Sequence, residues 1–324
     1  MKNSKVEICF IGNAIVDILS KISYETLNKL KIPKGSMQLV DEESSDKILK
    51  YIKHPSIISG GSAANTAVGF KSFGGTCSFI GQIGNDKFGD LFSKDLNNSG
   101  IFFKSKNFQS TDKTSKSIIL VTPDAERSMN TFLGASVRFN INSFDEKFII
   151  NSSMIYIEGY LFDQPEAKEA IYHCCNLAKS QNKKVALSLS DLFCVDRHRI
   201  DFINLIENYV DIIFANEHEI KSLYQSDLVQ SINTIKNNVD FGAITLGSKG
   251  SIVFENKAEH SIDPIFIEEL VDTTGAGDLF AAGFLFGFIN KYSIEKCGHL
   301  GNKAASEIIK HIGARPKTSL KAIL

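Results

Sequence analysis

The sequence lacks a membrane-spanning segment and the features of a secretory signal. Its longest stretch without strongly polar residues, Leu279 to Ile289, is far shorter than the roughly 20 apolar residues that cross a bilayer. The apolar run at the N-terminus contains Glu7, Asn13 and Asp17, which break the continuous core that a signal peptide needs. We therefore expect a cytoplasmic protein that makes no membrane contact.

A strong charge of either sign and the spacing of a metal site are also missing. The formal net charge is -1, without the basic bias typical of nucleic-acid binders, so no nucleic-acid partner is expected. The six cysteines are scattered, and the adjacent pair Cys174 and Cys175 lacks the two-residue gap of zinc ligands. No HExxH pattern occurs either. These absences predict reduced thiols and no zinc.

What the sequence does contain is an alternation of short β-branched runs with helical patterns. This rotation is typical of an α/β fold whose mostly parallel sheet is covered by helices on both faces. The expected strands are Val6–Ile11, Ser78–Ile80, Ser117–Val121, Met154–Ile157, Val185–Leu189, Ile212–Phe214, Ala243–Leu246 and Ser251–Phe254. The expected helices are Ala63–Phe73, Asp90–Asn98, Pro165–Ser180, Arg199–Tyr209 and Glu217–Tyr224.

Two segments, about 15–40 and 101–135, do not follow this rotation. The second alternates as an antiparallel meander would, and we expect the two to form one small sheet that acts as a lid. With 6 prolines in the chain and no Pro-, Gly- or Ser-rich linker, nothing divides the sequence into separate units. The prediction is a single domain, 1–324, that carries a lid.

A small-residue turn precedes an entirely apolar helical run near the C-terminus. Gly275, Ala276 and Gly277 let backbone amides converge at the helix N-terminus, where unpaired donors and the helix dipole bind anions. Asp278 follows in the first turn, next to the place for a phosphate. It could merely stabilise the helix N-terminus, but an acid that leads into a buried helix also suits a kinase base.

Two familiar nucleotide motifs are absent. No G-x-x-x-x-G-K-[ST] occurs, and no G-x-G-x-x-G follows the first strand. The phosphate chemistry is therefore not that of a P-loop, and a hydride-transferring dinucleotide enzyme is not expected.

The segment Asp272–Asp278, continued by Ala282–Gly283, resembles the C-terminal signature of the PfkB carbohydrate kinase family, the ribokinase superfamily. The segment Gly60–Ala67 resembles that family's N-terminal signature. The resemblance runs from Gly12 to Pro316. It implies a three-layer ribokinase-like fold with a mostly parallel central sheet and a small β-sheet lid. It also implies ATP-dependent phosphorylation of a hydroxymethyl group on a sugar or nucleoside.

The resemblance assigns the phosphate chemistry to named residues. Asp278 matches the catalytic base, and the amides of Gly275, Ala276 and Gly277 match the anion hole for the transferring phosphoryl group. Arg127 stands where adenosine kinases carry an arginine that neutralises phosphate charge.

The acceptor residues follow from the same resemblance. Asp17 matches an acid that accepts hydrogen bonds from a sugar diol, a task that suits the two oxygens of a carboxylate. Asn13 precedes it by four residues, and Gly61 and Asn65 match residues that complete the acceptor pocket. Without the resemblance, Asp17 would be interpreted as a turn residue and Asn65 as a first-turn helix residue.

Asn216 and Glu219 resemble the family's N-x-x-E motif, which places magnesium and phosphates. Glu219 would act on Mg²⁺ mainly through water. The alternative is a purely structural capping box, because Asn at the N-cap with Glu three residues later produces the same pattern.

The segment Thr245–Gly250 resembles the turn that receives the phosphates and ribose of ATP, through Thr245, Gly247 and Gly250. Its alternative is an ordinary hairpin. Asn302 is matched, more weakly, to the edge of the adenine pocket.

The choice of acceptor rests on Ala186–Phe193, Val210–Glu217 and Gly61–Asn65, which are similar to the adenosine kinase branch. This similarity puts adenosine or a related purine nucleoside first and a sugar of the ribokinase or fructokinase type second. A non-catalytic nucleotide or sugar sensor is the third alternative, and it would be expected to lack the base or the glycines. A nucleoside base needs an apolar slot, for which the candidates are Phe132, Phe162, Phe193 and Met37, with core packing as the alternative.

The implied cofactors are ATP and Mg²⁺, with a K⁺ requirement left open. The implied partner is a small-molecule acceptor, and the chain is expected to be a monomer or a homodimer.

Overall fold

The computed structural model describes residues 5–105, 112–124 and 126–324. The predicted lid segment 101–135 therefore includes residues, 106–111 and 125, that lie outside the described part. The nine-stranded large sheet has the order β14-β13-β12-β11-β10-β9-β1-β5-β6. Its strands are β1 (Val6–Ile11), β5 (Cys77–Ile80), β6 (Phe102–Phe103), β9 (Ser152–Glu158), β10 (Lys184–Ser188), β11 (Ile212–Asn216), β12 (Phe241–Thr245), β13 (Ser251–Glu255) and β14 (Ala258–Ile262). All pairs are parallel except β12–β13 and β13–β14.

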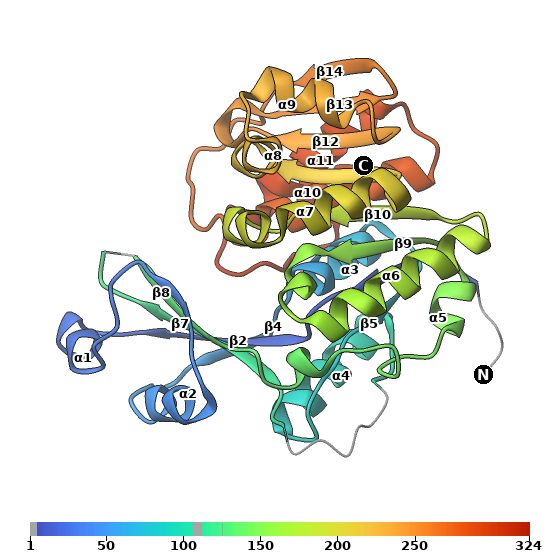
Figure 1. Cartoon of the computed structure of the whole chain (residues 1–324). Helices are drawn as coiled ribbons and strands as arrows, with labels where there is room; N and C mark the ends of the chain where they lie inside the picture. The colour runs from blue at the N-terminus through green and yellow to red at the C-terminus, as the bar shows by residue number, and fades with distance from the viewer. Residues whose placement is uncertain (1–4, 106–111, 125) are drawn as a thin grey trace.

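Helices cover both faces of the large sheet, as the alternation in the sequence predicts (Figure 1). On β1, Ile8 and Phe10 belong to one core and Cys9 and Ile11 to the other, because successive side chains point to opposite faces. The first core packs against α3 (Ser62–Phe73), α4 (Lys87–Asn98), α10 (Ala276–Ile289) and α11 (Ile294–Ile308). The second packs against α5 (Lys147–Ile150), α6 (Pro165–Ser180), α7 (Leu192–Tyr209), α8 (Glu217–Tyr224) and α9 (Leu228–Ile235).

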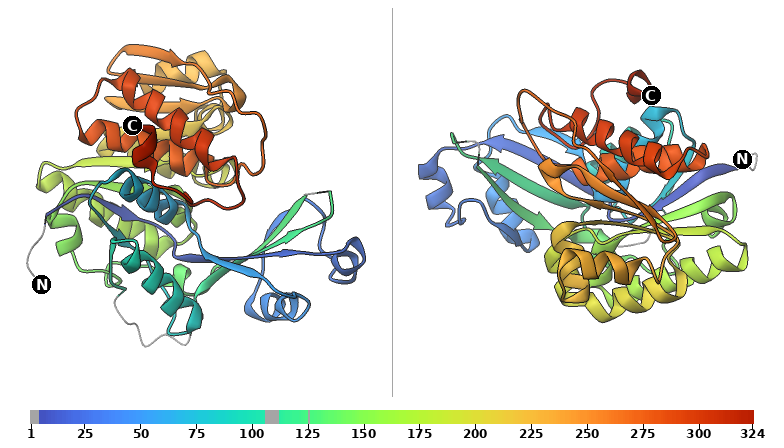
Figure 2. Two further views of the ribbon diagram at one scale, coloured as in Figure 1. Left: turned by 180° about the vertical axis from the view of Figure 1, so that it is seen from behind. Right: turned by 90° about the horizontal axis from the view of Figure 1, so that it is seen from above.

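The second sheet has five strands in the order β3-β8-β7-β2-β4. It projects beyond the carboxyl end of β1, and its strands and two helices appear away from the three layers in Figures 1 and 2. One face packs against the helices through Ile22, Leu27, Ile48, Ile118 and Leu120. The elements are β2 (Ile15–Lys21), α1 (Tyr24–Lys29), β3 (Met37–Leu39), α2 (Glu42–Leu49), β4 (Ser56–Ser59), β7 (Ser115–Val121) and β8 (Arg127–Phe132).

Two sequence expectations about this sheet need correction. Residues 102–103 form β6 and pair with β5 in the large sheet, so they are not part of the second sheet. The strand β4, outside both predicted segments, pairs with β2. Within the second segment, β7 and β8 are antiparallel as expected, whereas β2–β7 and β3–β8 join segments distant in the chain in parallel.

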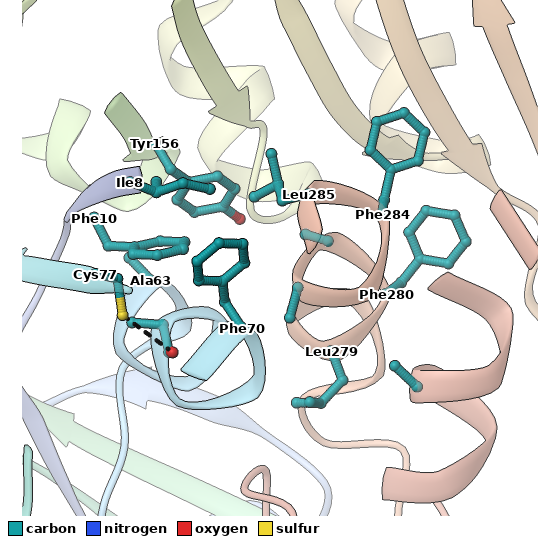
Figure 3. Packing of buried hydrophobic residues seen from close by; sticks show 14 of the residues in the cluster. Ile8, Phe10, Ala63, Phe70, Cys77, Tyr156, Leu279, Phe280, Phe284 and Leu285 are labelled. Carbon is teal, nitrogen blue, oxygen red and sulfur yellow. Dashed lines mark hydrogen bonds between the residues drawn. The ribbon is translucent and has the colours of Figure 1, made fainter. Parts of the chain in front are cut away.

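The buried helix α10 fixes the geometry of the site. Its body packs tightly against α3 and the large sheet in the core shown in Figure 3. A Cβ on Gly69 of α3 would come within 2.6 Å of Leu279 Cδ1. Phe284 makes an edge-to-face contact with Phe214 of β11, with ring centroids 5.2 Å apart. Helix α10 therefore holds its N-terminus in a set position beside the N-terminus of α3.

Four 3-10 helices complete the chain: η1 (Gly134–Arg138), η2 (Gly159–Asp163), η3 (Gly247–Lys249) and η4 (Leu320–Ile323). All six cysteines are buried and free. Among the described residues, no helix is both long and apolar enough to cross a membrane.

Candidate active site

Asp278 lies in the first turn of α10 and is held by two side chains from the first turn of α3. Ser62 Oγ donates to Asp278 Oδ1 at 2.6 Å, and Asn65 Nδ2 donates to Asp278 Oδ2 at 3.0 Å. Burial raises the pKa of Asp278 to about 6, while these two hydrogen bonds favour the charged form. At neutral pH the group is thus an ionised, oriented carboxylate. Ser62 was not assigned a role from the sequence.

The turn before Asp278 has the backbone shape of an anion site. Gly275 is the N-cap of α10 with φ of 79°, and no side chain caps this end. A Cβ on Gly277 would meet nothing within 4 Å, so the space beside this helix N-terminus is open. The backbone amide of Ala276 donates to the carbonyl of Thr273 at 3.2 Å within the turn. Its predicted place in the anion hole therefore requires this hydrogen bond to be shared or broken.

Asp17 and the early glycines lie together, although they come from separate elements. A Cβ on Gly60 would come within 2.3 Å of Asp17 Oδ2, and one on Gly61 within 2.3 Å of the Asn13 carbonyl. Gly61 has φ of 90°, which favours glycine. Burial raises the pKa of Asp17 to about 7, with the nearby Arg315 lowering it and Asp278 raising it. Asp17 lies inside β2, so it is not the turn residue that its sequence pattern alone would suggest.

Glu158, at the end of β9, is a site residue that the sequence analysis missed. Its Oε1 accepts from Asn13 Nδ2 at 2.9 Å and from the Asn13 amide at 3.3 Å, and its Oε2 accepts from the Ala63 amide at 2.8 Å. The residue is 1% exposed, and burial raises its pKa to about 7. It ties the end of β1 to the start of α3. The only signal in the sequence was an acidic residue directly after the apolar run of β9.

Arg127 of β8 joins the second sheet to the turn before α10. Its Nη1 donates to Asp272 Oδ1 at 2.5 Å and to Thr274 Oγ1 at 2.7 Å. Burial acts to raise the pKa of Asp272, but hydrogen bonds from Arg127, Gly313 and Thr274 bring it below its ordinary value. Arg127 therefore contacts the turn before α10, and its action on phosphate charge stays a prediction.

Asn216 and Glu219 form the complete capping box that the sequence allows. The Asn216 side chain accepts from the Glu219 amide at 2.9 Å, and Glu219 Oε2 accepts from the Asn216 amide at 2.9 Å. Burial raises the pKa of Glu219 to about 7. Both carboxylate oxygens already serve Asn216, so any contact with a metal ion would use the remaining lone pairs through water.

Thr245 ends β12, and the following residues form the hairpin to β13. Gly247 has φ of 62° with no atom within 4 Å of a Cβ, whereas a Cβ on Gly250 would meet the Ile262 carbonyl at 2.1 Å. The side chain of Asn302 donates through Nδ2 to the Asp263 carbonyl at 2.8 Å, and its Oδ1 accepts from Ser251 Oγ at 3.2 Å. Its polar atoms thus fasten the chain after β14, and its nucleotide role stays a prediction.

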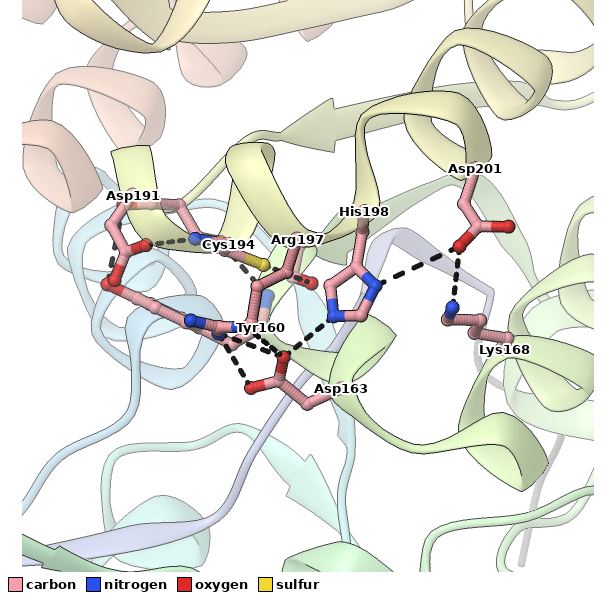
Figure 4. A network of polar contacts seen from close by, with 10 residues as sticks. Tyr160, Asp163, Lys168, Asp191, Cys194, Arg197, His198 and Asp201 are labelled. Carbon is pink, nitrogen blue, oxygen red and sulfur yellow. Dashed lines mark hydrogen bonds and ion pairs between the residues drawn. The ribbon is translucent and has the colours of Figure 1, made fainter. Parts of the chain in front are cut away.

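A charged network fixes the loops after β9 and β10 (Figure 4). Asp163 of η2 accepts from Arg197 Nη2 at 2.9 Å and contacts His198 Nε2 at 2.8 Å. Lys168 of α6 pairs with Asp201 of α7 at 2.5 Å. These contacts link η2, α6 and α7 at the edge of the sheet where the site lies.

Of the four candidates for the apolar slot, two are elsewhere. Phe162 is fully buried and packs against Phe202, with ring centroids 4.6 Å apart. Phe132 lies under the buried Lys116, which pairs with Asp46 of α2 on the helix-covered face. Core packing explains the position of Phe162, whereas Phe132 is partly exposed on the helix-covered face of the second sheet. The two other candidates, Phe193 and Met37, are exposed.

The pfkB family carbohydrate kinase model matches residues 34–321. The chain therefore belongs to the pfkB family. It has the ribokinase-like fold of this family and is a phosphotransferase with an alcohol group as acceptor, and membership of a kinase family implies the use of ATP. A sensor without turnover is correspondingly disfavoured.

Relatives in the pfkB family place the chain near adenosine kinases. It is 27% identical to an adenosine kinase of Dictyostelium discoideum over 96% of both chains. The crystal structure of adenosine kinase from Sinorhizobium meliloti is 38% identical, with a TM-score of 0.91 over 99% of this chain and 98% of that one. A 5-dehydro-2-deoxygluconokinase of Geobacillus kaustophilus is 26% identical over 77% of this chain and 78% of its own.

Proposed function

We propose that this chain transfers the γ-phosphoryl group of ATP to the hydroxymethyl group of a purine nucleoside, with adenosine as the first candidate. One observation supports the proposal most directly. The Asp278 carboxylate stands at an uncapped helix N-terminus with open space beside Gly277. Its hydrogen-bond donor Asn65 also contacts Arg315, which lines one cavity with Asp17. A base, an anion site and a diol acceptor thus converge.

In the proposed reaction, Asp17 accepts hydrogen bonds from two hydroxyls of the acceptor and sets its position. The hydroxymethyl oxygen forms the new bond to the γ-phosphorus, and the bond from that phosphorus to the β,γ-bridging oxygen breaks. The proton of the hydroxymethyl group goes to Asp278. Since the transition state is loose, Asp278 acts mainly by orientation and late proton acceptance. The amides at the start of α10 hold the negative oxygens.

The residues present fit ATP with magnesium. The open space at Gly277 and Gly247 leaves the backbone of both turns accessible to phosphates. In the described part of the chain, no group of three or more His, Cys, Asp or Glu side chains could hold a metal alone. In the proposed reaction the ion would be bound chiefly by phosphates and water, with Glu219 in the outer layer. When bound, Mg²⁺ neutralises phosphate charge.

One face of the second sheet carries Asp17 and lies opposite the face that is covered by α1 and α2. The residues of this Asp17 face favour a nucleoside over a free sugar. The register places Asp17 and Leu19 of β2 beside Ser117 and Ile119 of β7, and Ile119 beside Met129 of β8. Met37 and Leu39 of β3 continue this face and are 49% and 59% exposed. Next to Asp17, Leu19 and Ile119 are buried. An apolar face that runs from Asp17 to an exposed edge at β3 suits a flat base attached to ribose.

A sugar kinase is the second candidate. It is favoured by the similarity to 5-dehydro-2-deoxygluconokinase, and Asp17 with Asn13 could hold the diol of a sugar as well as that of a nucleoside.

An ATP-consumption screen with adenosine, inosine, guanosine, ribose and fructose, each with and without K⁺, separates the candidates. We expect the highest kcat/KM with a purine nucleoside. The Asp278→Asn variant, prepared in the same way, controls for contaminating kinases. Turnover of ribose or fructose with none of any nucleoside would replace the first candidate by the second, and no turnover of any acceptor would contradict both.

A further inference from the structure

Arg315 lies in the segment after α11 and is fixed beside the site by its neighbours. The amide of Gly313 donates to Asp272 Oδ2 at 2.9 Å. A Cβ on Gly275 would come within 2.6 Å of the Ala314 side chain, so this segment packs directly on the turn before α10. The Arg315 side chain is only 11% exposed. The sequence analysis gave it no role.

The guanidinium group of Arg315 determines how Asn65 meets Asp278. Its Nη1 is paired with Asp95 of α4, and its Nε donates to Asn65 Oδ1 at 3.4 Å. A guanidinium can only donate, so it holds the amide oxygen of Asn65 toward itself. The amide nitrogen is then left to donate to Asp278 Oδ2, as observed at 3.0 Å.

The third nitrogen of Arg315 is unsatisfied. Its Nη2 is buried and has no hydrogen-bond partner among the described residues, which is rare for a charged donor. The side chain lines a cavity of about 10 Å³ together with Asp17, Arg127 and Asp272. This is room for a single oxygen atom, such as that of a water molecule or a hydroxyl group. A donor without a partner, beside the carboxylate assigned to the acceptor diol, is suited to an oxygen of a bound molecule.

We propose that Arg315 binds an oxygen of the acceptor through Nη2 and, through Nε, holds Asn65 in the orientation that hydrogen-bonds Asp278. It is thus both a binding residue for the acceptor and a positioning residue for the base. This inference rests on the proposed function, because it needs an acceptor that places a hydroxyl oxygen in the cavity beside Asp17.

The charges around Asp17 lead to a pH signature. Arg315 favours the ionised form of Asp17, and Asp278 opposes it. Arg127 and Asp272, which line the same cavity, are paired with each other. Loss of the Arg315 charge should therefore raise the pKa of Asp17 further, so that acceptor binding weakens at higher pH than in the wild type.

The test compares Arg315→Gln, Arg315→Lys and Asp95→Asn. The last variant breaks the ion pair with Arg315 but keeps the contact of Nε with Asn65. Steady-state rates are measured from pH 5.5 to 9 with the acceptor found in the screen, together with the melting temperature. We expect Arg315→Gln to raise the acceptor KM and lower kcat by about 10-fold each, the size of one lost charged hydrogen bond. The KM for ATP should stay close to the wild-type value.

The acid limb of kcat/KM should move to higher pH in Arg315→Gln and return in Arg315→Lys, which keeps the charge without the planar fork. Asp95→Asn should stay near wild type in all these values. Equal effects of Asp95→Asn and Arg315→Gln, or a loss confined to the melting temperature, would overturn the role of Arg315 while leaving the proposed function intact. Calorimetric titration with adenosine and ribose measures acceptor binding even if the protein shows no turnover. A wild-type protein that neither binds nor phosphorylates any acceptor would overturn both proposals.

Discussion

Helix α10 and the second sheet both supply charged groups to the site, but the two are held in different ways. Asp278 begins a helix whose body is buried among aromatic and aliphatic side chains of the main core. Asp17 and Arg127 come from a sheet that projects from the three layers (Figure 1). This sheet contacts the turn before α10 through the hydrogen bonds of Arg127 to Asp272 and Thr274. In the proposed mechanism, this difference separates the base and the anion site on α10 from Asp17, which holds the acceptor. Changes at Asp278 should therefore lower kcat and changes at Asp17 should act on the acceptor KM, whereas Arg127 is expected to act on phosphate charge.

The largest expected effect is that of Asp278→Asn. Because asparagine cannot take the proton of the hydroxymethyl group, kcat should fall by at least about 100-fold. Binding of ATP, measured by calorimetry, should persist because the amides of the turn remain. A kcat near that of the wild type would remove Asp278 from the role of base.

Asp17→Asn tests the second-sheet side of the comparison. Asparagine retains one acceptor oxygen in place of two, so the acceptor KM should rise by about 10-fold or more. Initial rates at varied acceptor concentration measure this, and kcat should change much less. A variant that loses kcat while keeping the wild-type KM would show that the two regions do not divide the work in this way.

A pair of glycine variants sharpens the comparison within α10 itself. Gly277→Val places a side chain in the open space beside the helix N-terminus, so kcat should fall by about 10-fold while the melting temperature stays unchanged. Gly283→Ala is the matched control, because its Cβ would come within 2.5 Å of the Leu300 carbonyl. That variant should lose about 1 to 3 kcal/mol of stability. If Gly277→Val were as active as the wild type, the space would not hold the phosphate.

The pH dependence follows from the two raised pKa values. Asp278 must be ionised to accept a proton, so kcat should fall as the pH drops through about 6. The term kcat/KM for the acceptor should begin to fall earlier, near pH 7, as Asp17 takes up a proton. Rates measured between pH 5 and 9 test the order of the two limbs. A flat kcat profile down to pH 5 would be inconsistent with a buried base.

The smallest effect is expected at the edge of the second sheet. Leu39→Ser removes apolar surface from the face that would contact a base, and the nucleoside KM should rise by about threefold. The KM for ribose, if ribose is turned over, should not change. Equal changes for both acceptors would argue against contact between this face and a base.

Much of the site could be predicted because its residues follow short motifs at strand ends and helix starts. Asp278, Gly275, Gly61 and Asn65 lie in such motifs, and the parallel order of the large sheet brings strand ends to one edge. The alternation of apolar runs likewise predicted the two covered faces, since each strand of the large sheet divides its side chains between two cores.

The remainder depends on contacts between distant segments, which local patterns do not encode. Glu158 and Arg315 act through partners that are 145 and 250 positions away. The pairing of β4 with β2 and of β6 with β5 depends on the path of the chain between the two sheets. Phe162 illustrates the same point, because composition does not tell which aromatic side chains the core takes up.

The central claim is that the acceptor hydroxymethyl group lies between Asp278 and the phosphate held at the start of α10. A crystal structure with adenosine and a non-hydrolysable ATP analogue tests it most directly. The account predicts the 5′ oxygen of adenosine within about 2.6 to 3.2 Å of an Asp278 carboxylate oxygen, with the terminal phosphate against the backbone at Gly277. An acceptor bound elsewhere, or a terminal phosphate remote from this turn, would contradict it.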